Sequence, residues 1–364
     1  PGKNPHENLR FMVFLTSLIA AVDRHQDLLR LTVASAGNDH RLGANEAPPA
    51  IISIFMGSDL QGVIDTIIAG ESHHGFEGEK LHLGVNSLPN FPRDTTDRNR
   101  TSPFAFTGNK FEFRAPGSSQ SLAYPNYVLN TILAESLEDL AEKIEALGEE
   151  KRSNAAIQEI LRETLTEHQR ILFPGDNYTD AWAEEAGRRG LLNLKDTPAA
   201  LEQLNAPKNI ALFSKYKVLS EREWLSRTEI VAGAYQEKLR VEARVAVDMA
   251  ATLFLPAALR AQHKTADSLN AARKASQSLN LDVQVNHLTK IANLISTLQG
   301  SIDKLRERLD NPATEADAVA RARKSATNLI GPMDELRAVV DELEMLVADD
   351  LWPVPKYREL LTVH

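Results

Sequence analysis

The chain has 364 residues, enough for two domains with substantial cores, and 43% hydrophobic with 25% charged residues is an ordinary globular composition. A formal net charge of −9 argues against nucleic acid as a partner, because sequence-independent binding requires a basic surface. The absence of cysteine excludes disulfides, thiolate nucleophiles and cysteine-ligated zinc. No apolar run approaches the roughly 20 residues of a membrane-spanning helix, so we expect no membrane partner.

The first 150 residues mix helix and strand patterns. In chain order, apolar spacing and turn residues predict a helix at 5–34, a strand at 50–56, a mixed polar stretch at 57–98, a β-hairpin at 104–114 and a helix from about 125 to 147. Gly108-Asn109 is the predicted tight turn of the hairpin, since both residues tolerate the backbone conformations that such turns require.

Residues beyond 150 are rich in Ala, Leu, Glu and Arg and carry few strand signals. Ser220 and Glu223 form a capping box that predicts a long helix through about Leu255. Two further helices carry apolar residues in steps of three and four, at Leu288, Ile291, Ile295, Leu298, Ile302, Leu305 and Leu309, and then at Leu329, Met333, Leu336, Val340, Leu343 and Val347. We predict that they pair as an antiparallel hairpin. The pattern favours an internal bundle, and leaves an oligomer contact open.

The segment at 110–114, KFEFR, is the most informative motif of the chain. Lys110, Glu112 and Arg114 alternate with Phe111 and Phe113, as in a strand with one charged and one apolar face. The charged face places a carboxylate between two cations, about 7 Å from each along the strand. Such a face suits an anionic, metal-bound substrate, and the alternative is a salt-bridged surface strand.

A second motif is the loop at 37–49, GNDHRLGANEAPP. Gly43 and Asn45 tolerate left-handed backbone conformations, while Pro48-Pro49 stiffens the end of the loop. Glu46 therefore lies on a loop that is flexible on one side and anchored on the other, as expected of a residue on a lid.

Three ordered segments, RLGANEAP, RNRTS and KFEFR, together resemble the C-terminal half of the glutamine synthetase catalytic domain. Their exact residues most resemble the type III branch. The resemblance implies an α+β fold. Residues 1–148 would be the C-terminal part of the catalytic domain, with antiparallel strands, helices and a probable insertion at 57–98. Residues 149–364 would be a helical C-terminal domain, a mainly α-helical bundle with a long antiparallel hairpin. The expected protein is a cytoplasmic, ring-shaped dodecamer that joins L-glutamate and ammonia with ATP and Mg²⁺ or Mn²⁺.

The same resemblance assigns site residues one by one. It implies that Glu112 is a metal ligand, that Arg114 and Arg41 bind glutamate, and that Glu46 is the catalytic lid carboxylate that accepts a proton from ammonium. The resemblance also implies that Arg100, a catalytic residue, contacts phosphate, and Arg98 and Arg93 are alternatives for this role. Lys110 would lie near ATP, at a position where the family more usually has arginine. A second phosphate arginine of the family stays unassigned, because the corresponding stretch reads Pro103-Phe104-Ala105-Phe106.

The family's other metal carboxylates, its metal-binding histidine and its ammonia-side acid are not among the matched motifs. The chain begins with Pro1, so either processing has removed an N-terminal part or the chain is a piece of a longer protein, and the resemblance favours the piece. Because one carboxylate cannot hold two or three divalent ions, we expect the chain by itself to be inactive. Glu71, His73, His74, Glu77 and His82 have no specific ligand spacing and are interpreted as a solvated loop. The alternatives are a related ligase that joins another amine to the γ-carboxyl of glutamate, and a non-catalytic interaction or regulatory module.

Overall fold

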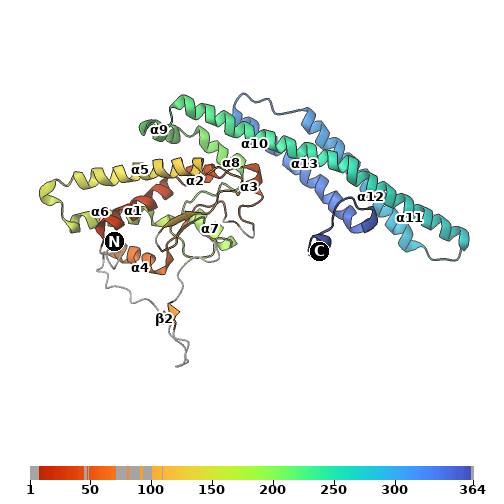
Figure 1. The fold of residues 1–364 in the computed structure, drawn as a ribbon, viewed down its shortest axis with the longest axis horizontal. Helices are drawn as coiled ribbons and strands as arrows, with labels where there is room; N and C mark the ends of the chain where they lie inside the picture. The colour runs from red at the N-terminus through yellow and green to blue at the C-terminus, as the bar shows by residue number, and fades with distance from the viewer. Residues whose placement is uncertain are drawn as a thin grey trace. The chain divides into compact units, whose positions relative to one another are not determined.

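The structure, a computed structural model, describes residues 8–44, 47, 49–70, 80–81, 91–92, 101–108 and 110–361 (Figure 1). By their contacts the residues fall into two compact units, unit 1 at Pro1–Arg227 and unit 2 at Thr228–His364. Within the described ranges no helix is long and apolar enough to cross a membrane.

Unit 1 is built around helix α1 (Leu9–Arg24), which packs against α5 (Ala123–Glu145) and α6 (Asn154–His168). The Asn8 side chain accepts a hydrogen bond from Phe11 N and caps the start of α1. The single helix predicted at 5–34 is wrong in one respect. His25, with φ −120° and ψ 30°, interrupts it, and α2 (Gln26–Thr32) follows as a separate helix.

A three-stranded sheet lies beside these helices. Strand β1 (Ile54–Phe55) runs parallel to β4 (Phe104–Phe106), which pairs antiparallel with β5 (Phe111–Phe113). The strand pairing predicted within 104–114 is confirmed. The strand predicted at 50–56 is shorter than expected, since only Ile54–Phe55 pair in the sheet and Met56 caps the start of helix α4 (Gly57–Ala69), which takes up the first part of the polar stretch. Two further short strands, β2 (Lys80–Leu81) and β3 (Phe91–Pro92), pair with each other.

Unit 1 also contains the short helix α3 (Ala36–Asp39) and helices from residues beyond 148. The latter are α6, α7 (Asp180–Arg188), α8 (Thr197–Leu201) and α9 (Pro207–Lys215). Leu172 forms a parallel bridge with Ile54, and Phe173 N donates to Ile54 O at 2.9 Å. Ser53 Oγ donates to Asn177 Oδ1 at 2.7 Å. The segment at 172–177 is thus folded against the sheet, and residues 149–227 belong to the same compact unit, because the units divide at 227/228. The family-domain boundary at 148/149 stays a prediction.

Long helices dominate unit 2, and the first of them, α10 (Glu221–Met249), begins in the last residues of unit 1. The capping box at the start of α10 is confirmed, since Ser220 N donates to Glu223 Oε2 at 2.8 Å and Glu223 N donates to Ser220 Oγ at 3.3 Å. The helix does not end near Leu255 as predicted. A π-helical turn at Ala250–Phe254 leads directly into α11 (Leu255–Ala275).

Helix α12 (Asp282–Asp310) contacts both α11 and α13 (Ala318–Leu346). Most of the predicted apolar positions are buried inside unit 2, namely Ile291, Leu298, Ile302, Leu305, Leu329, Leu336, Val340, Leu343 and Val347. This burial favours the internal bundle. After α13, the Trp352 ring stacks on Phe254 of the π-helical turn, with centroids 5.1 Å apart.

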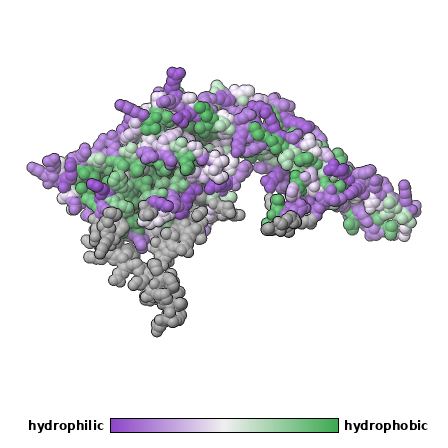
Figure 2. Space-filling model, viewed as in Figure 1, coloured by the Kyte–Doolittle hydropathy of each residue, from purple (hydrophilic) through white to green (hydrophobic). Residues whose placement is uncertain are grey.

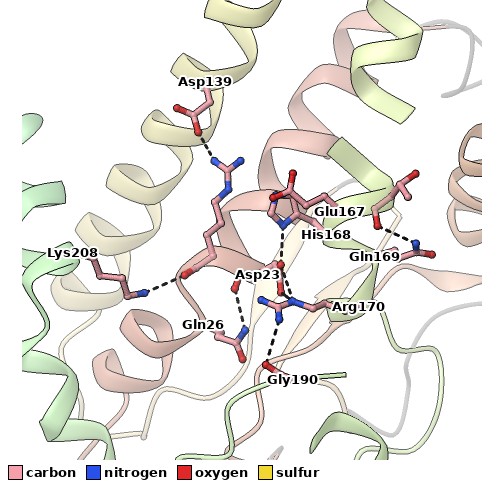
Figure 3. A network of polar contacts seen from close by, with 11 residues as sticks. Asp23, Gln26, Asp139, Glu167, His168, Gln169, Arg170, Gly190 and Lys208 are labelled. Atoms are coloured by element: carbon pink, nitrogen blue, oxygen red, sulfur yellow. Dashed lines mark hydrogen bonds and ion pairs between the residues drawn. The ribbon is translucent and has the colours of Figure 1, made fainter. Parts of the chain in front are cut away.

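Buried charges hold the C-terminal end of α1 in place (Figure 3). Asp23 is 2% exposed and pairs with His168 Nδ1 and Arg170 Nε, each at 2.8 Å. One residue beyond α1, His25 Nε2 lies 2.5 Å from Glu135 Oε2 of α5. These contacts join α1 to α5, α6 and the turn after α6. Over the region of α1, Figure 2 shows hydrophobic side chains gathered at the surface, and Phe14 of α1 is 51% exposed.

The pair of His25 and Glu135 predicts an acid-sensitive contribution to the stability of unit 1. The hydrogen bond from His25 is the main reason that the pKa of Glu135 is lowered, against desolvation that raises it. A carboxyl group with a lowered pKa in the folded state stabilises that state above its unfolded pKa, and the contribution is lost as pH falls through the folded value. We expect Glu135→Gln to cost about 1 kcal/mol of unfolding free energy at pH 7, and less near pH 3.

The measurement is urea denaturation at both pH values, followed by fluorescence of Trp182 and Trp224, which are buried in unit 1. Glu142→Gln, on the exposed face of the same helix, is the matched control and should change neither value. An equal cost of Glu135→Gln at both pH values would contradict the interpretation.

Candidate functional site

The β4–β5 hairpin fixes which side chains share its polar face. Glu112 lies opposite Ala105 in the ladder. Arg114 N donates to Pro103 O at 2.8 Å, which extends the ladder, and Thr107 N donates to Lys110 O at 2.9 Å, which closes the turn. The turn that connects the two strands contains Gly108, whose backbone has a positive φ of 94°, a conformation that glycine adopts readily.

Four phenylalanines occupy the opposite face of the hairpin and anchor it. The Phe104 ring centroid lies 5.6 Å from that of Phe111 and 6.0 Å from that of Phe113, and Phe106 lies 5.1 Å from Phe111. Since side chains alternate along a strand, this cluster forces Glu112 to the other face.

Glu112 is held between two cations, as the spacing predicts. Its Oε2 lies 3.2 Å from Arg114 Nε, and its Oε1 lies 3.6 Å from Lys110 Nζ. Desolvation acts to raise the pKa of Glu112, but the hydrogen bond and charge of Arg114, followed by those of Lys110, outweigh it and lower the pKa. The carboxylate is therefore ionised at neutral pH and available to a cation.

The three side chains differ in exposure, which bears on what each can do. The Arg114 side chain is 12% exposed, whereas those of Glu112 and Lys110 are 38% and 66% exposed. A largely buried guanidinium has few orientations and suits a fixed, bidentate partner such as a carboxylate. The exposed Lys110 ammonium is a mobile point charge that suits a phosphate.

The structure brings Arg41 to the end of β5. Arg41 follows the short helix α3 (Ala36–Asp39), where Asn38 N donates to Ser35 Oγ at 3.2 Å. Arg41 Nη1 donates to Asn38 Oδ1 and to Ala115 O, both at 3.1 Å. Arg41 thus contacts the backbone that directly follows Arg114, which brings the two predicted glutamate-binding residues to the same end of the hairpin.

Asn38 is a structural member of this site that the sequence did not single out. It is 3% exposed, and its Nδ2 donates to Val33 O at 2.7 Å and to Ala115 O at 3.1 Å. The only signal in the sequence was its place in a loop rich in glycine and asparagine. Local sequence cannot indicate a hydrogen bond to a strand more than 70 residues away.

Several predicted residues lie outside the described part of the chain. They are Glu46, Arg93, Arg98 and Arg100, together with Glu71, His73, His74, Glu77 and His82. Among the residues that are described, no group of three or more histidine, aspartate or glutamate side chains could hold a metal ion. Glu112 fits a hard divalent cation as one oxygen ligand, and one carboxylate does not complete such a site.

The comparisons with known proteins converge on one family. The model of the glutamine synthetase C-terminal domain matches residues 156–273. A type-3 glutamine synthetase of Dictyostelium discoideum is 45% identical over 99% of this chain. Glutamine synthetases of Bacteroides fragilis and Butyrivibrio fibrisolvens are 37% and 36% identical, again over 99% of the chain. Nearly the whole chain is similar to glutamine synthetases.

The resemblance to the type III branch is thereby confirmed. The chain spans about half the length of these relatives, 50% of the Dictyostelium protein and 51% of each of the other two. The matched C-terminal domain runs from α6 into α11, so this part of a glutamine synthetase contributes both to unit 1 and to unit 2.

The contacts of Asn38 generate a stability prediction. Asn38→Ala leaves the buried carbonyl of Val33 without the side-chain donor that it has now, and weakens the link between Ala115 and α3. We expect a loss of about 1–3 kcal/mol in the free energy of unfolding of unit 1, measured by urea denaturation.

Asn130→Ala is the control for this prediction, because Asn130 is exposed and its Nδ2 donates only to Asn126 O, in the preceding turn of its own helix. That variant should differ from the parent chain by about 0.5 kcal/mol or less. Equal effects of the two substitutions would show that the Asn38 bridge contributes nothing of its own.

Proposed function

We propose that this chain supplies part of the active site of a glutamine synthetase, an enzyme that joins ammonia to the γ-carboxyl of L-glutamate with ATP, through γ-glutamyl phosphate. The observation that carries the proposal is the polar face of β5. There an ionised Glu112 lies between Arg114 and Lys110, with Arg41 beside the strand end, in a chain 45% identical to a type-3 glutamine synthetase.

Glutamate is the substrate that suits the two arginines. Its carboxylates match the planar fork of a guanidinium, and Arg114 is largely buried and thereby restricted in orientation. Arg41 is held by Asn38 and by the backbone after Arg114, so the two cations are fixed relative to each other. A dicarboxylate held at fixed points presents its γ-carboxyl in a defined place for phosphoryl transfer.

The divalent cation, Mg²⁺ or Mn²⁺, would take Glu112 as one of its oxygen ligands. When bound, the cation neutralises the charge that develops on the transferring phosphoryl group. The remaining ligands would come from parts of the enzyme beyond the described residues. On this reasoning the chain by itself holds an incomplete site, and an active enzyme needs further carboxylates.

The other roles follow from the family resemblance. Arg100, with Arg98, and Lys110 would contact the phosphates of ATP. Glu46 would close over the acyl phosphate, exclude water and take a proton from ammonium. We propose the cytoplasmic, ring-shaped dodecamer on the same resemblance.

The proposal is tested by ADP release that depends on glutamate and ammonia. The chain is assayed with ATP and Mg²⁺, first alone and then joined to the half of the Dictyostelium enzyme that it does not match. Activity only in the joined protein supports the proposal. ADP release by the chain alone would overturn the claim of an incomplete site. The absence of ADP release by both the chain and the joined protein would overturn the proposed function. Substituting methylamine or ethanolamine for ammonia tests the alternative γ-glutamyl-amine ligase.

In the joined enzyme we expect Glu112→Gln to lower kcat at least about 100-fold and to raise the Mg²⁺ concentration needed for half-maximal rate, because a neutral amide is a weak ligand for a hard cation. We expect Arg114→Lys to raise the KM for glutamate about tenfold with little change in the KM for ATP, since lysine lacks the bidentate fork. Glu142→Gln on the exposed face of α5 is the control and should change neither constant. An unaltered Mg²⁺ dependence in Glu112→Gln would exclude the role as a ligand.

A further inference from the structure

The loop that carries Arg41 is tied at its base to a helix from the region beyond residue 148. Thr197, the first residue of α8, is fully buried. Its backbone N donates to Asp39 Oδ1 at 2.9 Å, and its Oγ1 donates to the same oxygen at 2.7 Å. Asp39 is the last residue of α3, two positions before Arg41.

Arg30 of α2 joins the same cluster from a third side. Its side chain is 2% exposed, with Nη2 3.7 Å from Asp39 Oδ1. Its Nε donates to Leu194 O at 2.8 Å, so Arg30 contacts both Asp39 and the segment that leads into α8. Arg30, Asp39 and Thr197 are here called the Asp39 cluster.

Taking the charges of Arg30 and Asp39 out of water costs free energy, because their side chains are only 2% and 16% exposed. Burial is the largest influence on Asp39 and raises the pKa of its carboxyl, while the two hydrogen bonds from Thr197 and the charge of Arg30 oppose that shift. Burial likewise lowers the pKa of Arg30. Charges in such a place are stable only while their partners stay in position, so removing one partner is felt by the others.

The geometry of the loop base carries this constraint to the site. Arg41 N and Leu42 N both donate to Asn38 O, at 3.0 and 2.9 Å, and Asn38 lies next to Asp39. Asn38 is fixed to Ala115 at the end of β5, and Asp39 is fixed to Thr197 at the start of α8. Hydrogen bonds on two sides, to Ala115 and to Thr197, therefore hold the residues at 38–42, which we call the loop base.

We propose that Thr197 and Arg30 are positioning residues for glutamate binding, which act through Asp39 to set the place of Arg41. The inference rests on the proposed function, and it gives α8 a role in the site although neither residue contacts substrate. It also offers a reason why residues 149–227 fold against the catalytic part of unit 1.

The structural half of the inference is tested in the 364-residue chain by amide hydrogen exchange of the peptide that covers the loop base. Thr197→Val removes the Oγ1 donor and keeps the shape of the side chain. Loss of one hydrogen bond corresponds to about two- to tenfold faster exchange at Arg41 and Leu42. Thr197→Ser keeps the donor and should restore the parent rate.

Thr179→Val is the matched control. It is the same substitution at the start of α7, where Thr179 Oγ1 bonds only to the nearby backbone of Asp176 and Trp182. We expect it to leave exchange of the loop base unchanged. If both valine variants accelerated that exchange equally, or if neither did, the Asp39 cluster would not hold the loop base, and the inference would be overturned.

The functional half is tested in the joined enzyme. We expect Thr197→Val to raise the KM for glutamate about two- to tenfold, with kcat and the KM for ATP within twofold, and Thr197→Ser to reverse the change. Faster exchange with an unchanged KM for glutamate would overturn the positioning role alone. If the parent joined enzyme had no activity at all, the proposed function would fall, while the exchange result would still stand as a measure of the Asp39 cluster.

Discussion

The phenylalanine face of the β4–β5 hairpin is the constraint on which the candidate site depends. Rings from both strands meet at 5–6 Å across the ladder, with Phe104 buried and the other three partly exposed, and this ring cluster sets the direction of the alternate positions. Glu112 and Arg114 share a face because the rings of Phe111 and Phe113 occupy the other one. A shift of register by one residue would send the charged groups into the apolar cluster and the rings into water.

The segments beyond residue 148 complete the surroundings of that hairpin. Leu172 and Phe173 extend the sheet along β1, Asn177 bonds to Ser53, and Thr197 holds Asp39. Most of these contacts involve buried polar atoms, which are expensive to leave without partners. The helical region next to the catalytic motifs is therefore part of the same folded body as far as Arg227, and the division into units comes later than a change in composition would suggest.

The motifs also explain where sequence patterns succeeded and where they failed in this fold. The strand period at 110–114 and the capping box at Ser220 are local patterns, and each has one low-energy outcome. The failures concern where helices end. The helical pattern runs through His25, but its backbone leaves the helical conformation and its side chain pairs with Glu135 of α5. Helical structure runs on past Leu255, since the π-helical turn at Ala250–Phe254 leads from α10 into α11. Pro256 lies near the start of α11, where a missing backbone donor is tolerated.

Three ordered motifs and a seam of apolar residues were enough, from the sequence alone, to indicate the family, the hairpin with its polar face and the helical second half. Those features depend on apolar residues that recur every two, three or four positions, and this spacing is present in the sequence whatever the tertiary structure. The sequence could not bring Arg41 to the backbone of Ala115, find the Asn38 bridge, or join Thr197 to Asp39. Each of those contacts links residues more than 70 positions apart. Only the packing of α2, α3, β5 and α8 in one unit decided them, because a buried hydrogen bond forms with whichever partner the tertiary fold delivers.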